Sequence, residues 1–295
     1  MATPLGPDLW IREVHKGIVG LYFKVERTLF SGTSPYQRID IYETAGHGKM
    51  LFNDGIIMLS ERDEFIYHEM IAHVPLFVHP APRQVLIIGG GDGGTVREVL
   101  KHPIVERVVL VEIDKMVVDA CRKYFPSLTS ALGDPRLEIR YEDGVRYVSD
   151  VPQTFDVVIV DSTDPIGPAE PLFGRTFYEN VSRALNPEGI LVTQAESAFY
   201  DPELQQPMLT HQRPFFKRLH LYLYSNLTYP GSLWGFGYAS KGLCPVRDFD
   251  PGRVAAANIS SRYYNAGVHR AAFMLPTFIA DQLGPSLDPV PDMSL

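Results

Sequence analysis

The pattern of apolar and polar positions divides the chain into two parts. Up to about residue 60, apolar and polar residues alternate between frequent glycines, as Ile39 and Ile41 do with their polar neighbours. This alternation favours half-buried antiparallel strands joined by turns. We therefore predict a small N-terminal antiparallel β domain of hairpins over residues 1–60.

A helix is expected directly after this domain. Ser60 is a good N-cap, and apolar residues recur at near-helical spacing until the prolines of residues 75–82, which are expected to end the helix. Acids in a first turn complement the helix dipole, so most of the charged side chains are expected to form a solvated face. These charged side chains include Glu61, Asp63, Glu64 and Glu69.

Downstream of residue 84, strands and helices follow each other. Strands are expected at 85–88, 107–111, 137–141, 157–160, 190–194, 219–225 and 233–239, and helices at 95–101, 115–124, 145–148, 175–185 and 202–213. Such alternation implies right-handed crossovers and an α/β domain with a doubly wound parallel sheet over residues 61–283. Residues 284–295 are rich in Pro, Ser and Asp and are expected to form a mobile tail.

Four consecutive β-branched residues at 157–160 lead directly into Asp161 and, after a short interval, Asp164. Such a run suits a parallel strand that is buried on both faces, and the ligands of these sheets bind beyond the carboxyl ends of the strands. Both carboxylates would then face a cleft. The alternative is that they are solvated acids at the start of a turn.

Residues 89–94 have the spacing G-x-G-x-x-G between an expected strand and an expected helix, and Glu112 ends the next strand. This context indicates a nucleoside or nucleotide site, because glycines allow close approach and the carboxylate can accept both ribose hydroxyls. Asp143 and Gly144, after the third strand, are placed where an adenine amino group could be held. Asp-Gly is, however, first of all a turn dipeptide.

Asp92 lies inside the glycine loop, and its negative charge bears on which kind of nucleoside ligand could bind there. It would repel either the pyrophosphate of a dinucleotide or the carboxylate of a methyl donor near the helix N-terminus. If its side chain faces the ligand, the group bound there is expected to be cationic. The alternative is that Asp92 turns away and caps the helix at Thr95.

Composition and charge narrow the class of protein. The chain has 295 residues, 45% of them hydrophobic, and a net charge of −8. These values suit a globular protein that does not bind nucleic acid generally and are compatible with a cationic small-molecule ligand.

No apolar run approaches the roughly 20 residues that span a bilayer, and no signal peptide is evident, so we expect a soluble, cytoplasmic protein. Cys121 and Cys244 have no ligand-like spacing.

Several motifs together resemble one enzyme family. They are Asp54-Gly55, residues 61–70, the glycine loop at 89–94, residues 161–168, and residues 263–265 with 269–271. From about residue 10 to 283 the chain is similar to the polyamine aminopropyltransferases, most closely the spermidine synthases. This resemblance implies an N-terminal β domain followed by a methyltransferase-like Rossmann domain. It also implies aminopropyl transfer from decarboxylated S-adenosylmethionine to a diamine, putrescine first of all, with spermidine and methylthioadenosine as products.

The resemblance also implies a role for each matching residue. Asp161 matches the proton acceptor of the family, and residues 162–174, including Ser162 and Thr163, match a loop that closes over the site. The adenosyl side is assigned to Gln37, Glu112, Asp143, Gly144 and Pro168. The amines are assigned to His68, Asp92, Asp161 and Asp164, with Tyr67 and Tyr229 lining their channel. No metal or cofactor is implied, since decarboxylated S-adenosylmethionine is a co-substrate.

Some alternatives stay open at this point. Met58 stands where many relatives have a glutamine beside the amine path, so cadaverine, agmatine or spermidine could replace putrescine as acceptor. A methyltransferase, a nicotinamide dehydrogenase and a non-catalytic polyamine-binding protein are the other classes. The acids Asp92, Asp161 and Asp164 argue against the first two, and Asp161, Tyr67 and the glycine loop argue against the third. By analogy with relatives, a homodimer or homotetramer is expected. Trp10, Trp234 and His269 are expected to be structural, with the alternative that Trp234 faces the polyamine through cation–π attraction.

Overall fold

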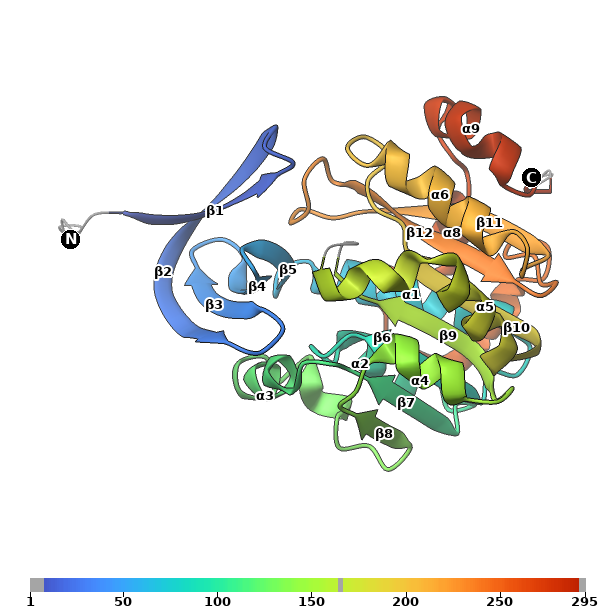
Figure 1. The fold of residues 1–295 in the computed structure, drawn as a ribbon, viewed down its shortest axis with the longest axis horizontal. Coiled ribbons are helices and arrows are strands. Elements are labelled where there is room, and N and C mark those ends of the chain that lie inside the picture. The colour runs from blue at the N-terminus through green and yellow to red at the C-terminus, as the bar shows by residue number, and fades with distance from the viewer. Residues whose placement is uncertain (1–7, 164–166, 292–295) are drawn as a thin grey trace.

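The computed structural model describes residues 8–163 and 167–291. The chain begins with five antiparallel strands that pair in chain order (Figure 1). They are β1 (Leu9–His15), β2 (Val19–Thr33), β3 (Arg38–Thr44), β4 (Gly48–Asn53) and β5 (Ile56–Ser60). The predicted N-terminal β domain is therefore confirmed.

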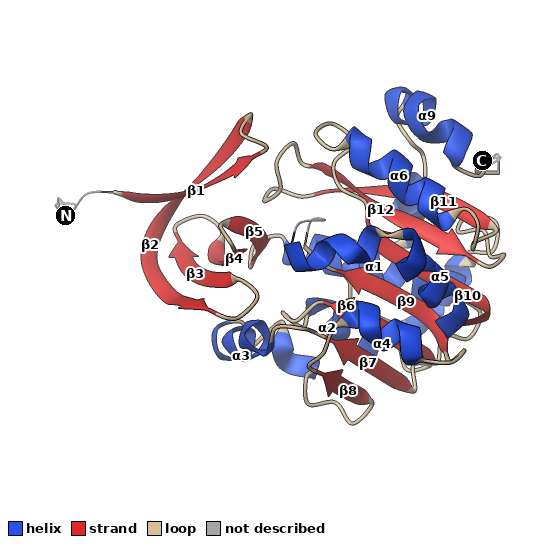
Figure 2. Cartoon of the chain, in the orientation of Figure 1, coloured by secondary structure: helices blue, strands red, loops and turns tan. Residues whose placement is uncertain are grey.

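The second sheet has seven strands in the order β11-β12-β10-β9-β6-β7-β8 (Figure 2). Its strands are β6 (Gln84–Gly89), β7 (Arg107–Val111), β8 (Leu137–Arg140), β9 (Phe155–Asp161), β10 (Leu185–Gln194), β11 (Arg218–Ser225) and β12 (Leu233–Ser240). The five strands from β6 to β10 are mutually parallel, as predicted, but β12 is antiparallel to both neighbours. The prediction of a wholly parallel sheet is wrong at this edge. A short loop joins β11 to β12, so the two strands run antiparallel, whereas parallel strands need a longer crossover connection. The Rossmann-like α/β class is confirmed.

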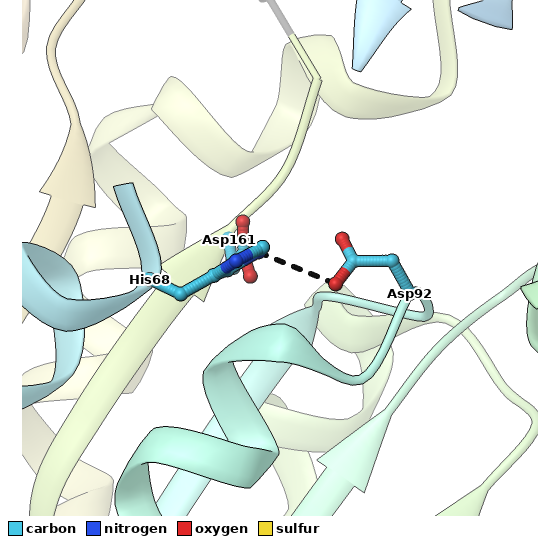
Figure 3. A group of neighbouring side chains, drawn as sticks. All are labelled: His68, Asp92 and Asp161. Carbon is cyan, nitrogen blue, oxygen red and sulfur yellow. Dashed lines mark ion pairs between the residues drawn. The ribbon is translucent and has the colours of Figure 1, made fainter. Parts of the chain in front are cut away.

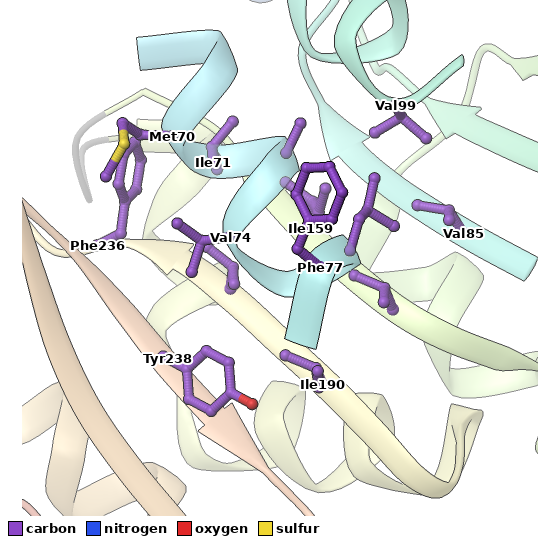
Figure 4. Packing of buried hydrophobic residues seen from close by; sticks show 14 of the residues in the cluster. Met70, Ile71, Val74, Phe77, Val85, Val99, Ile159, Ile190, Phe236 and Tyr238 are labelled. Carbon is purple, nitrogen blue, oxygen red and sulfur yellow. The ribbon is translucent and has the colours of Figure 1, made fainter. Parts of the chain in front are cut away.

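Helices cover both faces of this sheet, and successive residues of β9 show why. Val157 and Ile159 pack on the face covered by α1 (Glu64–Val78) and α2 (Gly94–Leu100), whereas Val158 and Val160 pack on the other face. Figure 4 shows the first of these faces, where α1 lies over the sheet. The opposite face is covered by α4 (Gly144–Asp150), α5 (Arg175–Ala184), α6 (Pro202–Gln212) and α9 (Thr277–Leu283). A strand buried on both faces explains the continuous β-branched run.

One further helix joins the two sheets. The helix α3 (Lys115–Tyr124) buries Val117 and Cys121 against Ile39 and Leu51 of the β domain. The described C-terminal region adds α7 (Pro251–Ala257) and α8 (Ala266–Ala272). Because α3 follows β7 directly, its packing holds the β domain over the carboxyl end of the parallel strands.

The helix α1 differs from its prediction at both ends. It begins at Glu64 after Asp63, while Ser60 ends β5, and it continues through Pro75 to Val78. Every residue from 67 to 78 is buried, so packing on all sides compensates for the hydrogen bond that the proline cannot donate. The predicted solvated face is wrong as well. Asp63, Glu64, His68 and Glu69 are all buried.

The start of the predicted tail lies on the edge of the sheet. The backbone N–H of Asp288 donates to the carbonyl of Leu219, and the Asp288 carboxylate accepts the Leu219 N–H at 2.7 Å and pairs with Arg213 at 2.9 Å. Residues 292–295 lie outside the described part of the chain. Among the described residues, no helix is long and apolar enough to cross a membrane.

Candidate active site

A pocket lies where the β domain meets the carboxyl ends of β6, β7 and β9. Strand β5, the start of α1, the glycine loop and the loop between β11 and β12 all contribute to its walls. Of the residues predicted for the site, the lining includes Gln37, Tyr67, His68, Asp92, Glu112, Asp143, Gly144, Asp161, Ser162, Thr163 and Tyr229. Asp164 lies outside the described residues, and so does the side chain of Pro168.

The glycine loop allows side chains to approach its backbone closely. A Cβ at Gly90, whose φ is +70°, would lie 2.8 Å from Oδ2 of Asp161, and a Cβ at Gly94 would lie 2.3 Å from the ring of His68. Any other residue at these two positions would displace the site's own carboxylate or imidazole. The glycines therefore serve the packing of the site as well as access for a ligand.

Asp161 ends β9 with both carboxylate oxygens hydrogen bonded. The Tyr67 hydroxyl donates to Oδ1 at 2.8 Å, and the Thr95 hydroxyl donates to Oδ2 at 2.6 Å. Burial raises the pKa of Asp161, and the negative charge of Asp92 raises it further. Burial and the charge of Asp161 likewise raise the pKa of Tyr67 well above its ordinary value, so Tyr67 stays a donor. Asp161 is thus a carboxylate placed to accept a proton.

His68 lies between two carboxylates, as Figure 3 shows for one of them. Its Nδ1 pairs with Glu64 at 2.6 Å and its Nε2 with Asp92 at 3.3 Å. Burial alone would lower the pKa of His68, but Asp92 and Glu64 outweigh it and raise the pKa to about 10. His68 is therefore a cation, which attracts Asp92 rather than a cationic amine.

A second cation, Arg97, binds Glu64 on the side away from the pocket lining. Two nitrogens of Arg97 bind the two oxygens of Glu64, at 3.1 and 2.9 Å. Burial would raise the pKa of Glu64, but its bonds to His68 and Arg97 lower it. Counting Glu64, Asp92 and Asp161 against His68 and Arg97, the cluster carries an excess of one negative charge when Asp161 is ionised.

Asp92 does not turn away from the pocket to cap the helix at Thr95. Its carboxylate lines the pocket and pairs with His68, and its Oδ1 accepts the backbone N–H of Gly94, the first residue of α2, at 2.7 Å. The Thr95 hydroxyl donates to Asp161 instead. Burial would raise the pKa of Asp92, but the charge of His68 lowers it, so Asp92 is ionised.

His68, Asp92 and Asp161 are close enough to be tested as a metal site, since one ligand atom of each lies within 4.8 Å of the others. The donor set fits a metal poorly. A metal-binding imidazole must be neutral and offer a lone pair, whereas both ring nitrogens of His68 are engaged by carboxylates and its pKa is raised to about 10. The cluster suits a cationic organic ligand better.

The side of the pocket expected to bind a nucleoside is built around Glu112. Its carboxylate accepts the backbone N–H of Gly91 at 3.1 Å and of Asp114 at 2.8 Å. Burial raises the pKa of Glu112 to about 7. Gln37 donates to Asp114 at 3.0 Å, and Asp143 caps α4 by accepting the N–H of Val145 at 2.8 Å. The loops that would flank an adenosyl group are thus fixed by their own acids.

The opposite end of the pocket is aromatic. The Tyr67 ring contacts Tyr229 with centroids 6.3 Å apart, and Tyr229 contacts Trp234 at 5.1 Å. The Tyr229 hydroxyl donates to the carbonyl of Met58 at 2.7 Å, so this tyrosine is fixed against β5. Trp234 lines the pocket, whereas Trp10, also expected to be a packing residue, is 52% exposed.

Comparison with known proteins identifies the family. The Spermine/spermidine synthase domain model matches residues 64–250, and the model of the Spermidine synthase tetramerisation domain matches residues 9–61. The chain belongs to the spermine/spermidine synthase family. Sequence comparison agrees: the polyamine aminopropyltransferase of Alkaliphilus metalliredigens is 43% identical over 94% of this chain and 98% of its own. That of Thermotoga maritima is 45% identical, covering 94% of each chain.

Solved structures of spermidine synthases superpose over nearly the whole chain. One, in complex with the transition-state analogue AdoDATO, has a TM-score of 0.93 and 44% identity, covering 95% of this chain and 96% of that one. Another, from Thermotoga maritima, has a TM-score of 0.91 with the same identity and coverage. The predicted family, its Rossmann-like fold with an N-terminal β domain and its aminopropyltransferase class are confirmed.

Three acids of this family member were missed or misjudged from the sequence. Glu13 lines the pocket and accepts the Ile57 N–H at 2.7 Å. Asp63 binds the backbone N–H groups of residues 227 and 228, and Glu69 accepts three from residues 262–264 at 2.8 Å each. One signal was available for Glu13. In β1 the polar residues at alternate positions face inward and Val14 faces outward, the reverse of an ordinary surface strand.

His269 has the structural role expected of it. One ring nitrogen bonds the Tyr264 hydroxyl at 2.8 Å and the other lies 2.9 Å from the carbonyl of Pro245, while the ring stacks on Phe249. Burial lowers its pKa to about 4, so it is neutral.

Proposed function

We propose that this enzyme transfers an aminopropyl group from decarboxylated S-adenosylmethionine to putrescine and releases spermidine and methylthioadenosine. The observation that carries the proposal is Asp161, hydrogen bonded to Tyr67 at the junction of the glycine-loop side and the aromatic side of one pocket. Family membership and the superposed spermidine synthase with AdoDATO support the same chemistry.

The donor would lie with its adenosyl group against Glu112, Asp143 and Gly144. An ionised Glu112 can accept both ribose hydroxyls, and the glycine loop leaves room for the sugar. Decarboxylation of the donor removes the carboxylate that Asp92 would repel and leaves an amine that Asp92 attracts. In this scheme Asp92, oriented by His68, selects the decarboxylated donor, and His68 itself positions the carboxylate rather than binding an amine.

The chemical step is a displacement at carbon. The lone pair of the acceptor nitrogen forms a bond to the aminopropyl carbon next to the sulfonium, and the carbon–sulfur bond breaks with its electron pair going to sulfur. Because the acceptor is an ammonium group near neutral pH, one proton must leave it in each turnover. Asp161 takes that proton, and the step requires no metal because the sulfonium is already a good leaving group.

The acceptor would extend from Asp161 along Tyr67 and Tyr229 towards Trp234. We propose that its second ammonium group lies near two pocket carboxylates, Glu13 of β1 and Asp63 directly before α1. Asp164, Ser162, Thr163 and Pro168 belong to the segment proposed to close over bound substrates. Cadaverine, agmatine and spermidine are the alternative acceptors, since Met58 makes part of the wall apolar.

We also propose that the chain assembles as a homotetramer or homodimer through its β domain. The match to the tetramerisation-domain model supports this. The outer face of β1 and β2, together with the turn between them, exposes large apolar side chains, as expected of an interface. These are Trp10, Val14, Ile18 and Tyr22.

The proposal is tested by incubating the protein with decarboxylated S-adenosylmethionine and each of putrescine, cadaverine, agmatine and spermidine. Methylthioadenosine and the new polyamine are measured together. We expect equal amounts of both, with the highest kcat/KM for putrescine. Methylation from intact S-adenosylmethionine without methylthioadenosine would contradict the proposal, whereas a preference for another amine would correct the acceptor alone.

A further inference from the structure

The turn between β1 and β2 is fastened to the Rossmann domain by a compact polar cluster. Lys16 Nζ pairs with Oδ1 of Asp201 at 2.7 Å and donates to the carbonyl of Tyr200 at 2.7 Å, while His15 Nε2 lies 3.2 Å from Oδ2 of Asp201. We call His15, Lys16, Tyr200 and Asp201 the hairpin clamp. The carboxylate of Asp201 is buried, and the two residues that grip it come from a different domain.

Lys16 and Gly17 are the central residues of the turn between β1 and β2. Their φ values are +51° and +73°, and the Ile18 N–H donates to the carbonyl of His15, as in the common hairpin turn that has positive φ at both central residues. The Lys16 side chain is only about one-third exposed and also pairs with Glu203. The turn therefore presents an ammonium group that is held by two acids of the Rossmann domain, Asp201 and Glu203.

The hairpin clamp contacts the aromatic side of the pocket, which consists of Tyr67, Tyr229 and Trp234. The His15 ring contacts Tyr200 at 5.5 Å and Trp234 at 6.0 Å between centroids. Tyr200 in turn packs on Gly231, where a Cβ would lie 2.8 Å from its ring. Figure 1 shows the β1–β2 hairpin reaching towards the loop between β11 and β12, which includes Gly231. Ring contacts therefore run without a break from Tyr67 beside Asp161 to His15.

The clamp also fixes the opposing wall. Glu13 precedes His15 by two residues on the same inward face of β1, and it lines the pocket together with Trp234. Glu13 and Tyr229 are each hydrogen bonded to β5, through the Ile57 N–H and the Met58 carbonyl. The clamp adds a second attachment beyond these bonds, because it holds the tip of the β1–β2 hairpin against Asp201 and the His15 ring against Trp234. The part of the pocket near Asp161 is built without the clamp, from α1 and the glycine loop.

We propose that the hairpin clamp determines which length of amine acceptor the enzyme accepts, by fixing the end of the pocket remote from Asp161. This inference rests on the proposed function. The clamp residues act by positioning and do not touch the reacting atoms. Loosening the clamp should therefore weaken binding of the short diamine and relax discrimination against longer amines, with little effect on the nucleoside donor.

The test compares Lys16→Met and Asp201→Asn with two references. Lys16→Arg keeps the cation, and Arg27→Met removes a cation from an exposed ion pair with Glu43 in the same β sheet. For each protein, KM and kcat are measured for putrescine, cadaverine and spermidine and for the decarboxylated donor. Hydrogen exchange of residues 226–234 is measured on the free proteins.

Lys16→Met and Asp201→Asn are expected to raise the KM for putrescine about tenfold, which is in the range that one methylene contributes in a pocket. They should reduce the preference for putrescine over spermidine by a similar factor. The donor KM should stay within about twofold of wild type, and residues 226–234 should exchange faster. Lys16→Arg should keep the wild-type KM values for the amines and the wild-type preference among them, and Arg27→Met should also leave both unchanged.

Three outcomes overturn the inference, and they are distinguishable. If folded Lys16→Met protein is active with wild-type acceptor KM values and an unchanged preference among the amines, the clamp does not set acceptor length while the proposed function stands. If the wild-type protein forms no methylthioadenosine with any amine, the proposed function fails and the inference fails with it. A loss that affects donor and acceptor equally also contradicts it, since that is the effect of a merely structural contact.

Discussion

The hydroxyl of Tyr67 and the carboxylate of Asp161 form a buried hydrogen bond of 2.8 Å between the first helix of the Rossmann domain and its central strand. With Thr95 bound to the other oxygen, the carboxylate has a single orientation. A carboxylate oxygen has more than one lone pair, so each can still accept a proton from an approaching ammonium group. If Asp161 is the base that we propose, this arrangement would hold it in one orientation, with no cationic side chain of the described residues at hydrogen-bonding distance.

Replacing Asp161 by asparagine should preserve the shape of the site and remove its base. We expect turnover to fall by about 10²- to 10⁴-fold, the usual contribution of a general base. Methylthioadenosine formation is the measurement, and binding of methylthioadenosine to the variant checks that the pocket is intact. Turnover close to that of wild type would rule out Asp161 as the proton acceptor.

The acidic limb of the pH profile of kcat should shift in opposite directions when Asp92 and Tyr67 are replaced. The charge of Asp92 raises the pKa of Asp161, and the hydrogen bond from Tyr67 lowers it. Asp92→Asn should therefore move the acidic limb of the profile to lower pH, and Tyr67→Phe should move it to higher pH. Profiles are measured at saturating substrates. Shifts in the same direction would show that another group produces the limb.

His68 makes stability depend on pH in the alkaline range. Its pKa is about 10 in the folded protein against an ordinary value of 6.5. A pKa raised by folding contributes stability that is fully present below about pH 6.5 and is lost as the pH rises through about 10. Wild type should therefore lose more of its free energy of unfolding than His68→Gln over this interval, by up to a few kcal/mol. Parallel denaturation curves at several pH values provide the measurement, and equal slopes for the two proteins would contradict the cationic state of His68.

Glu112 should make nucleoside binding depend on pH near neutrality. Its pKa is raised to about 7 in the free protein, and only the ionised form accepts both ribose hydroxyls. Methylthioadenosine should therefore bind more tightly as the pH rises from about 6 to 8. Glu112→Gln should bind weakly at every pH and lose this dependence. Calorimetric titration measures both, with Asp119→Asn on the exposed side of α3 as a control. A pH-independent affinity in wild type would contradict the assignment.

Local patterns predicted the features of this protein that arise locally. The β-branched run before Asp161 specified a strand buried on both faces, and the glycine loop between a strand and a helix specified a loop at the pocket, where nucleoside binding stays a prediction. Alternation in the first sixty residues specified the hairpin domain. Because the carboxyl ends of parallel strands share one edge of a sheet, even the proximity of Asp92, Glu112 and Asp161 followed from their order in the chain.

Contacts between distant segments could only be decided by the tertiary structure. The charges of α1 looked like a solvated face, yet Glu69 and Asp63 are buried because they bind backbone N–H groups from segments more than 160 residues away. The resemblance assigned His68 to the amines, but the two carboxylates that make it a cation could not be inferred from the sequence. The hairpin clamp joins Lys16 to Asp201. The sequence by itself determined the elements and the chemistry at their ends, whereas burial and charge state depend on partners that only folding brings together.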